Sequence, residues 1–127
     1  MIKIRRAKTS DVNAMTDVIF RSKQANGYDD AFMEACREEL RVTTTCLERA
    51  EFWVAVDGSI CGCVALAIDG ACGEIEKFFV DPDRQRQGIG RILWDQVMSR
   101  AQGANVTRLV LDADPTAVPF TRRSDLL

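Results

Sequence analysis

The sequence predicts an α/β fold in which a mixed, mostly antiparallel sheet carries helices on both of its faces. The dipeptide Asp-Gly twice separates two runs rich in β-branched and aromatic residues, which is typical of tight hairpins. Further along, a helical pattern stands between two strand patterns and indicates a crossover connection. Antiparallel strands followed by such a crossover give a mixed sheet covered on both sides. The expected order of elements is β-α-α-β-β-β-α-β-α.

Two helices are expected between the first strand and the hairpins. Residues 1–7, MIKIRRA, alternate apolar and polar side chains and predict that strand. Thr9-Ser10-Asp11 offers an N-cap for the first helix. Its apolar stripe is formed by Val12, Met15, Val18 and Ile19. The segment NGYDD, residues 26–30, ends it, and the stripe of the second helix is Phe32, Met33, Cys36 and Leu40. After the threonines at 43–45 the pattern changes to strands.

The second half of the chain predicts the sheet and its crossover. Strands are expected at residues 51–56 (EFWVAV), 59–68 (SICGCVALAI) and 73–80 (GEIEKFFV), with an Asp-Gly turn at 57–58 and at 69–70. The following helix has one apolar face, and Gly103 is placed to end it. That face consists of Ile89, Ile92, Leu93, Val97 and Ala101. Residues 106–111, VTRLVL, form the last strand, and Asp114-Pro115 opens a short final helix.

Length and charge narrow the class of protein. At 127 residues the chain is expected to form a single domain, residues 1–127. Its formal charge is −2 without blocks of like charge, which argues against nucleic acid or an anionic membrane as a partner. No stretch approaches the roughly 18 apolar residues of a membrane span. The basic N-terminus lacks the apolar core of a signal peptide, so a cytoplasmic location is expected.

The five cysteines are expected to be free thiols, because their number is odd and no export signal precedes them. Cys61 and Cys63 alternate on a predicted strand, so we expect both to pack in one apolar layer. The alternative, a pair of metal ligands, is less well supported because no second paired cluster accompanies them. The chain has no histidine, which excludes Ser-His-Asp and Cys-His mechanisms, and no metal is expected.

A glycine-containing loop, RQRQGIGR at residues 84–91, precedes the long C-terminal helical pattern. A turn that enters a helix there exposes backbone N–H groups without intrahelical partners, at the positive end of the helix dipole. Gly88 and Gly90 allow close approach, and Arg84, Arg86 and Arg91 add charge. The loop therefore predicts an anion site, most naturally for phosphate. The alternative is a helix N-terminus with solvated arginines.

The surroundings of this loop resemble a known family. The pattern Gln85-x-x-Gly88-x-Gly90, after EIEKFFVDP, is similar to the acetyl-CoA loop of the GNAT N-acetyltransferase superfamily, and LDADPTAVPF at 111–120 resembles the segment after that family's fifth strand. The resemblance implies acetyl-CoA as co-substrate. The residues it assigns to the pyrophosphate are Gln85, Arg86, Gln87, Gly88, Ile89, Gly90 and Arg91. The backbone of Phe78, Phe79 and Val80 would run beside the pantetheine arm, near a gap between the fourth and fifth strands.

Glu74 and Glu76 are the candidates for a general base, since residues two apart on a strand face the same side. The alternative is a pair of solvated glutamates, with a water chain as the proton route. Tyr28 lies in a region that lines the acceptor pocket in the family, or it is an ordinary loop aromatic. Family members often carry a tyrosine as general acid after the last "PF"; here Thr121 follows Phe120. A covalent acetyl-cysteine is not favoured, because no cysteine falls in the segments that flank the gap.

The resemblance implies an N-acetyltransferase that transfers an acetyl group to a primary amine of a small molecule or peptide. The alternative is an acyl-CoA-binding protein of the same fold with little or no turnover, and a third reading is an interaction protein without cofactor. Family members continue with a C-terminal pair of strands, whereas this sequence ends at PFTRRSDLL. Residues 106–111 would then present a hydrophobic edge, so a homodimer through the C-terminal region is expected.

Overall fold

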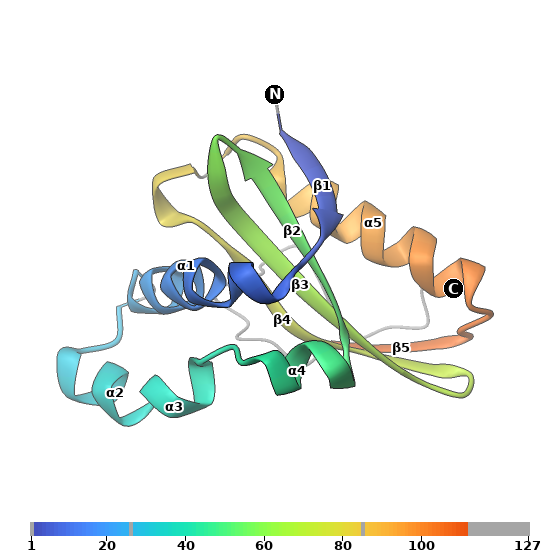
Figure 1. Ribbon diagram of the computed structural model, residues 1–127, viewed down its shortest axis with the longest axis horizontal. Coiled ribbons are helices and arrows are strands. Elements are labelled where there is room, and N and C mark those ends of the chain that lie inside the picture. The colour runs from blue at the N-terminus through green and yellow to red at the C-terminus, as the bar shows by residue number, and fades with distance from the viewer. Residues whose placement is uncertain (1, 26, 85, 112–127) are drawn as a thin grey trace.

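The computed structural model describes residues 2–25, 27–84 and 86–111, which form a five-stranded sheet in the order β1-β2-β3-β4-β5. The strands are β1 (Lys3–Arg6), β2 (Glu51–Asp57), β3 (Ser59–Asp69), β4 (Cys72–Val80) and β5 (Arg108–Leu111). Neighbours are antiparallel from β1 to β4, whereas β4 and β5 are parallel (Figure 1). The mixed, mostly antiparallel sheet expected from the sequence is confirmed.

Both predicted hairpins are present. The first turns at Gly58, with Asp57 paired to Ser59, and the second turns at Gly70 and Ala71, with Asp69 paired to Cys72. Gly58 and Gly70 have φ of 78° and 61°, in the left-handed region that favours glycine. The Asp-Gly signal was therefore informative at both positions, because it marks where the backbone needs a positive φ.

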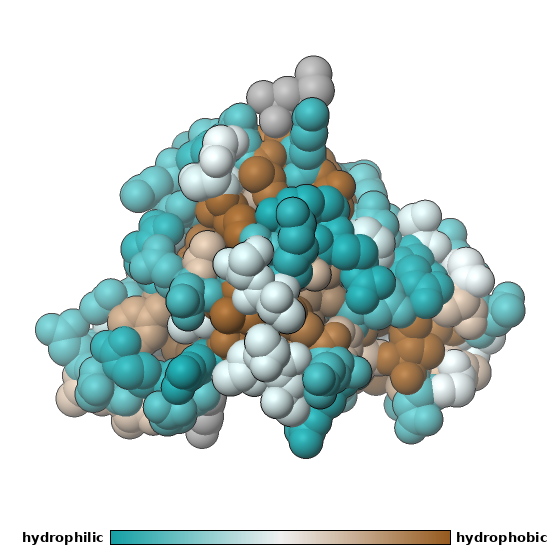
Figure 2. All heavy atoms as spheres, viewed as in Figure 1, coloured by the Kyte–Doolittle hydropathy of each residue, from teal (hydrophilic) through white to brown (hydrophobic). Residues whose placement is uncertain are grey.

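Helices cover both faces of the sheet (Figure 1). Helices α1 (Val12–Gln24), α2 (Asp30–Ala35), α3 (Arg37–Leu40) and α4 (Thr44–Arg49) lie on one face, and α5 (Ile89–Gly103) lies on the other. Each face has its own core. The α5-side core is built from residues such as Leu66, Ile75, Phe78, Leu93 and Val97. The α1-side core is built from residues such as Met15, Ile19, Phe52, Cys63 and Phe79. Figure 2 shows hydrophobic side chains mostly toward the middle of this view, with hydrophilic ones on the outer surfaces.

The helical region between β1 and β2 differs from the prediction in two ways. The expected second helix is interrupted at Cys36, whose φ and ψ of −91° and −3° separate α2 from α3. In addition, α4 begins at Thr44, where no helix was expected. The Thr43 side chain caps it by accepting a hydrogen bond from the Cys46 N–H at 3.4 Å. No helix was predicted here because β-branched threonines have low helix propensity, although Thr43 is a favourable N-cap residue.

The expectation that Cys61 and Cys63 share one apolar layer is wrong. Ala55 pairs with Gly62 but the next residue, Val56, pairs with Ile60, so Cys61 is the extra residue of a β-bulge. The bulge places Cys61 in the α5-side core and Cys63 in the α1-side core. All five cysteines are free thiols, as expected. Burial raises the pKa of the Cys61 thiol, and it raises that of Cys63 to about 12.

Within the described ranges, no helix is both long and apolar enough to cross a bilayer. The expected final helix at Asp114-Pro115 lies outside the described residues, as do Thr116, Phe120 and Thr121.

Candidate functional site

The N-terminus of α5 is open to solvent and has the geometry of an anion site. Gly88 is the N-cap, with φ of 78° and no side-chain cap, and the first backbone bond of the helix runs from the Ile92 N–H to the Gly88 carbonyl at 3.1 Å. The N–H groups of Ile89, Gly90 and Arg91 therefore precede the intrahelical ladder. A Cβ on Gly88 would meet nothing within 4 Å, so the positive φ, not crowding, requires glycine here.

Two of the three loop arginines remain exposed beside these N–H groups. Arg86 and Arg91 are exposed, and the Arg91 Nε lies 3.5 Å from the Asp95 carboxylate. Arg86 has φ of 66°, which adds a second left-handed turn before the helix. The helix dipole and these cations together favour an anion at the start of α5. Gln85, also predicted for this site, lies outside the described residues.

Arg84, the third loop arginine, is paired within the protein. Its Nη2 donates to Asp57 Oδ2 at 2.6 Å, and its Nε donates to Gln87 Oε1 at 3.0 Å. The hydrogen bond from Arg84 holds the pKa of the Asp57 carboxyl below its ordinary value. Because the charge is already paired, Arg84 anchors the loop to the β2–β3 turn. Sequence reasoning could not find this pair, since its two residues are far apart in the chain.

The start of the loop is anchored to α1 through Asp81. Arg21 donates two hydrogen bonds to the Asp81 carboxylate, at 2.8 and 3.0 Å. Asp81 also accepts from the Asp83 N–H at 2.9 Å, and its own N–H donates to the Cys61 carbonyl at 2.9 Å. The Arg21 hydrogen bonds hold the pKa of Asp81 below its ordinary value. The loop that leads into α5 is therefore anchored at its start by two ion pairs, Arg21–Asp81 and Arg84–Asp57.

Strand β4 extends well past its described pairing with β5. The parallel register runs from Cys72–Arg108 to Ile75–Leu111, where the described part of β5 ends. Residues 76–80 of β4 continue to the loop, and residues 77–80 are paired to β3 on their other side. The side chains of Phe78 and Phe79 are buried in opposite cores. The side chains of Phe78 and Phe79 are thus directed into the two cores, and the expected contact of this backbone with a ligand stays a prediction.

A second β-bulge sits in the middle of β4. Ala65 pairs with Lys77 but the next residue, Leu66, pairs with Ile75, which leaves Glu76 as the extra residue. Half-buried Glu74 stands opposite Ala67 and so faces the α1 side. Exposed Glu76 faces that side too, where it lines a cavity. The two candidate bases thus lie on the face of the sheet that is covered by α1–α4.

The cavity at this bulge has a volume of about 240 Å³ and is lined by Cys46, Arg49, Phe52, Glu76 and Lys77. Burial raises the pKa of the Cys46 thiol, but hydrogen bonding to Thr43 and the charges of Lys77 and Arg49 outweigh it, so this pKa lies below its ordinary value. The sequence analysis missed Cys46 and Arg49 because it missed α4. A threonine three residues before Cys46 was the available signal.

Tyr28 lies between α1 and α2, as expected. Its ring stacks on Phe32 with centroids 4.5 Å apart, and the Lys23 Nζ lies 4.9 Å from its centroid. Tyr28 does not line the cavity at the bulge, and its contacts are those of a partly buried aromatic at a helix junction.

The family model of the acetyltransferase (GNAT) family matches residues 14–124. The chain belongs to this family. The match runs from within α1 to beyond β5, so the GNAT resemblance drawn from the glycine loop is confirmed.

Individual GNAT relatives and structures agree with this assignment. The chain is 29% identical over 124 residues to the peptidyl-lysine N-acetyltransferase YjaB of Salmonella typhimurium, covering 97% of this chain and 81% of that protein. It is 37% identical over 57 residues to an IAA acetyltransferase of Azospirillum brasilense, covering 43% of this chain and 37% of that protein. The chain thus spans little more than a third of that relative's length.

The GNAT fold also appears in a solved structure. The PaiA N-acetyltransferase of Thermoplasma acidophilum, in complex with coenzyme A, superposes with a TM-score of 0.82 at 18% identity, covering 94% of this chain and 84% of that one. At this identity the likeness supports the fold. Among the described residues of this GNAT chain, no group of three or more cysteines and carboxylates could hold a metal ion.

Proposed function

We propose that this GNAT chain transfers the acetyl group of acetyl-CoA to a primary amine of a small molecule or peptide. The observation that carries this proposal is the open N-terminus of α5. Gly88 has φ of 78°, no side chain caps the helix, and exposed Arg86 and Arg91 stand beside its free N–H groups. Such a site fits a pyrophosphate. The family membership supports acetyl-CoA as its source.

In this proposal each part of the site has one task. The backbone N–H groups of Ile89, Gly90 and Arg91, with the side chains of Arg86, Gln87 and Arg91, bind the pyrophosphate, and Gln85 is assigned there by the family pattern. The backbone of Phe78, Phe79 and Val80 lies beside the pantetheine amides. Acetyl-CoA supplies an activated thioester, so the protein has to position the amine and remove its proton.

The acceptor is proposed to approach from the face that carries α1–α4. Glu74 and Glu76 lie on that face, at the position where the described β4–β5 pairing ends. Either carboxylate would take the amine proton, directly or through water, while the amine nitrogen attacks the thioester carbon and the carbon–sulfur bond breaks. Tyr28 is proposed to border the acceptor entrance. A relative named for peptidyl-lysine supports keeping peptide amines among the acceptors.

A homodimer through the C-terminal region is part of the same proposal. Within the described part of the sheet, β5 is the last strand, and its residues Leu109 and Val110 are apolar. An apolar edge strand recruits further strands. Light scattering should therefore give twice the mass of one chain, and a monodisperse monomer at working concentration would contradict the dimer.

The first test is a calorimetric titration of the purified chain with acetyl-CoA and with free CoA. We expect saturable binding of both, followed by release of free CoA when candidate amines are added. Binding without amine-dependent CoA release would instead support an acyl-CoA-binding protein with little turnover. Absence of binding at millimolar ligand would overturn both readings.

A further inference from the structure

Two strands and one helix line the cavity at the β4 bulge. Phe52 of β2 pairs with Ala65 of β3, which pairs with Lys77 of β4, so Phe52 and Lys77 lie in one row across the sheet. Ala65, between them, is fully buried. Helix α4 contributes Cys46 and Arg49 to the wall, and the bulge contributes Glu76. The volume of about 240 Å³ suits a ligand of few heavy atoms.

Among the described residues that line this cavity, Arg49 and Lys77 are cations and Glu76 is a carboxylate. The same two cations help to lower the pKa of the Cys46 thiol against the effect of its burial, so their positive field acts inside the cavity. A ligand that carries one positive or neutral amine and one anionic group would complement this arrangement.

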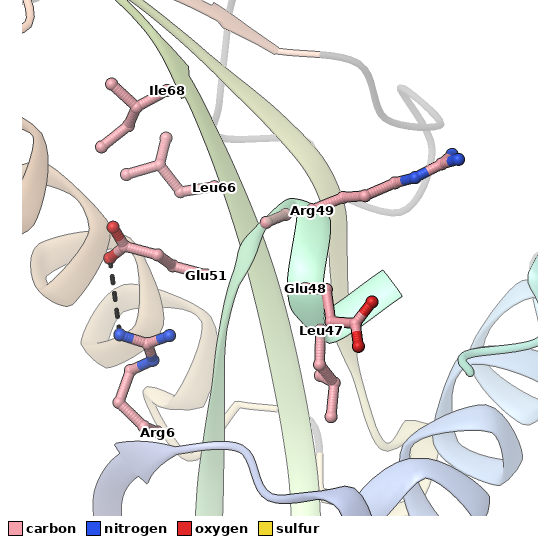
Figure 3. A pocket seen from close by; sticks show the side chains of 8 residues that line it. Arg6, Leu47, Glu48, Arg49, Glu51, Leu66 and Ile68 are labelled. Atoms are coloured by element: carbon pink, nitrogen blue, oxygen red, sulfur yellow. Dashed lines mark ion pairs between the residues drawn. The ribbon is translucent and has the colours of Figure 1, made fainter. Parts of the chain in front are cut away.

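Arg49 also lines a second hollow, together with residues that include Arg6, Glu48 and Glu51. Figure 3 shows the Arg49 side chain extending away from the Arg6–Glu51 ion pair of that hollow. Glu51 already forms ion pairs with Arg6, at 3.8 Å, and with Arg100, at 2.7 Å. Arg49 forms no ion pair with any described residue. Within the described ranges, its guanidinium is therefore not held by a carboxylate.

We propose that the acceptor of this enzyme is a small amine that also carries a carboxylate or a phosphate, with Arg49 and Lys77 binding the anionic group and Glu76 facing the amine. A guanidinium matches the two oxygens of a carboxylate or phosphate in a fork, and an ammonium adds a third donor. Phe52 contacts the carbon chain between the two ends. This inference rests on the proposed acetyl transfer and names its substrate class.

Matched amines test the proposal directly. We would measure kcat/KM by CoA release for β-alanine against propylamine, 4-aminobutyrate against butylamine, and 2-aminoethyl phosphate against both neutral amines. Each carboxylate pair differs only in the anionic group. We expect the anionic member to be preferred by about tenfold or more, since hydrogen bonds between charged groups are the strong ones. The measurement with 2-aminoethyl phosphate shows whether the site prefers a phosphate or a carboxylate. Equal use of neutral and anionic amines would overturn the proposal.

Three variants locate the effect. We expect Arg49→Gln and Lys77→Gln each to raise KM for the preferred anionic amine by roughly tenfold while leaving KM for the neutral partner within about twofold. Arg41→Gln is the control, because Arg41 is an exposed arginine that does not line the cavity. The proposal fails if Arg49→Gln weakens both amines equally, or if the control has the same effect.

Failure of the anionic-acceptor proposal can be distinguished from failure of the proposed acetyl transfer. Efficient turnover of neutral amines would preserve the transferase reading and overturn only the anionic acceptor. If no amine is turned over, the chain saturated with CoA is titrated with 4-aminobutyrate, butylamine and 2-aminoethyl phosphate by calorimetry. Binding of an anionic amine that Arg49→Gln abolishes would support the cavity assignment. Absence of such binding would overturn it, whether or not acetyl-CoA itself binds.

Discussion

Arg21 of α1 donates two hydrogen bonds, of 2.8 and 3.0 Å, to the carboxylate of Asp81 at the end of β4. The contact joins the first helix to the loop that precedes α5, 60 residues later in the chain. Arg84, three residues after Asp81, makes a corresponding contact with Asp57. The candidate pyrophosphate site is thus supported by two ion pairs whose members come from separate parts of the sequence.

We expect Asp81→Asn to lower the free energy of unfolding by about 1.5–3 kcal/mol, the range for hydrogen bonds that involve charged groups. The Asp81 side chain is only 14% exposed, so solvent screens this pair less than a surface pair. Asp17→Asn is a matched control, because Asp17 also binds Arg21, at 2.9 Å, but is 65% exposed. Its loss should cost less than about 0.5 kcal/mol. Urea titrations of both variants provide the comparison, and equal losses would contradict the assignment.

The same pair predicts a pH dependence. The pKa of Asp81 is lowered in the folded state from its ordinary value of 3.8, chiefly by the Arg21 hydrogen bonds. A depressed folded pKa contributes stability above the unfolded pKa and loses it as the pH falls through the folded pKa. The stability difference between the wild type and Asp81→Asn should therefore be constant near neutrality and shrink below about pH 3.8. A difference that grows on acidification would show the opposite sign.

Gly88→Val should weaken acetyl-CoA binding by roughly tenfold or more, since a β-branched residue at positive φ forces the loop backbone to move. Gly70→Val is the matched control, because Gly70 also has positive φ and open space around it but lies at the opposite end of β4. Calorimetry with acetyl-CoA should separate the two variants even if both lose stability. Comparable affinities would place the cofactor elsewhere.

Gly62→Ala should destabilise the contact between α5 and the sheet by about 1–3 kcal/mol, the usual cost of overpacking. A Cβ at this position would lie 2.9 Å from Ile89 Cγ2, 3.0 Å from Leu93 Cδ1 and 3.2 Å from the Phe79 carbonyl oxygen. Gly103→Ala is the control, since its Cβ would meet nothing within 4 Å. Thermal unfolding of both variants measures the difference. A neutral Gly62→Ala would mean that α5 shifts freely on the sheet.

Cys46 should react with iodoacetamide at neutral pH roughly tenfold or more faster than Cys63, since the thiolate is the reacting species. The Cys46 thiol is half-buried with a lowered pKa, whereas Cys63 is fully buried with a pKa of about 12. Arg49→Gln should slow the labelling of Cys46 by removing one of the neighbouring cations. Peptide mass spectrometry over time gives both rates, and a slower Cys46 would contradict the positive field.

Much of the fold could be predicted because its signals are local. Each Asp-Gly pair marked a tight turn that requires a positive φ at glycine, and the 3.6-residue period predicted α1 and α5. The start of α5 could also be predicted from the sequence, since Gly88 and Gly90 flank Ile89, the first residue of its apolar face. The family's cofactor loop was recognisable for the same reason: its residues are contiguous.

By itself, the sequence determined the mixed sheet, its two hairpins and the glycine-containing loop that leads into α5. Only the tertiary structure decided the bulges at Cys61 and Glu76, because strand register depends on the partner strand and not on the bulged strand alone. It also decided that Arg84 anchors the loop and that Arg49 of α4 meets Lys77 of β4 in one cavity. Such contacts join residues far apart in the chain, and packing brings them together.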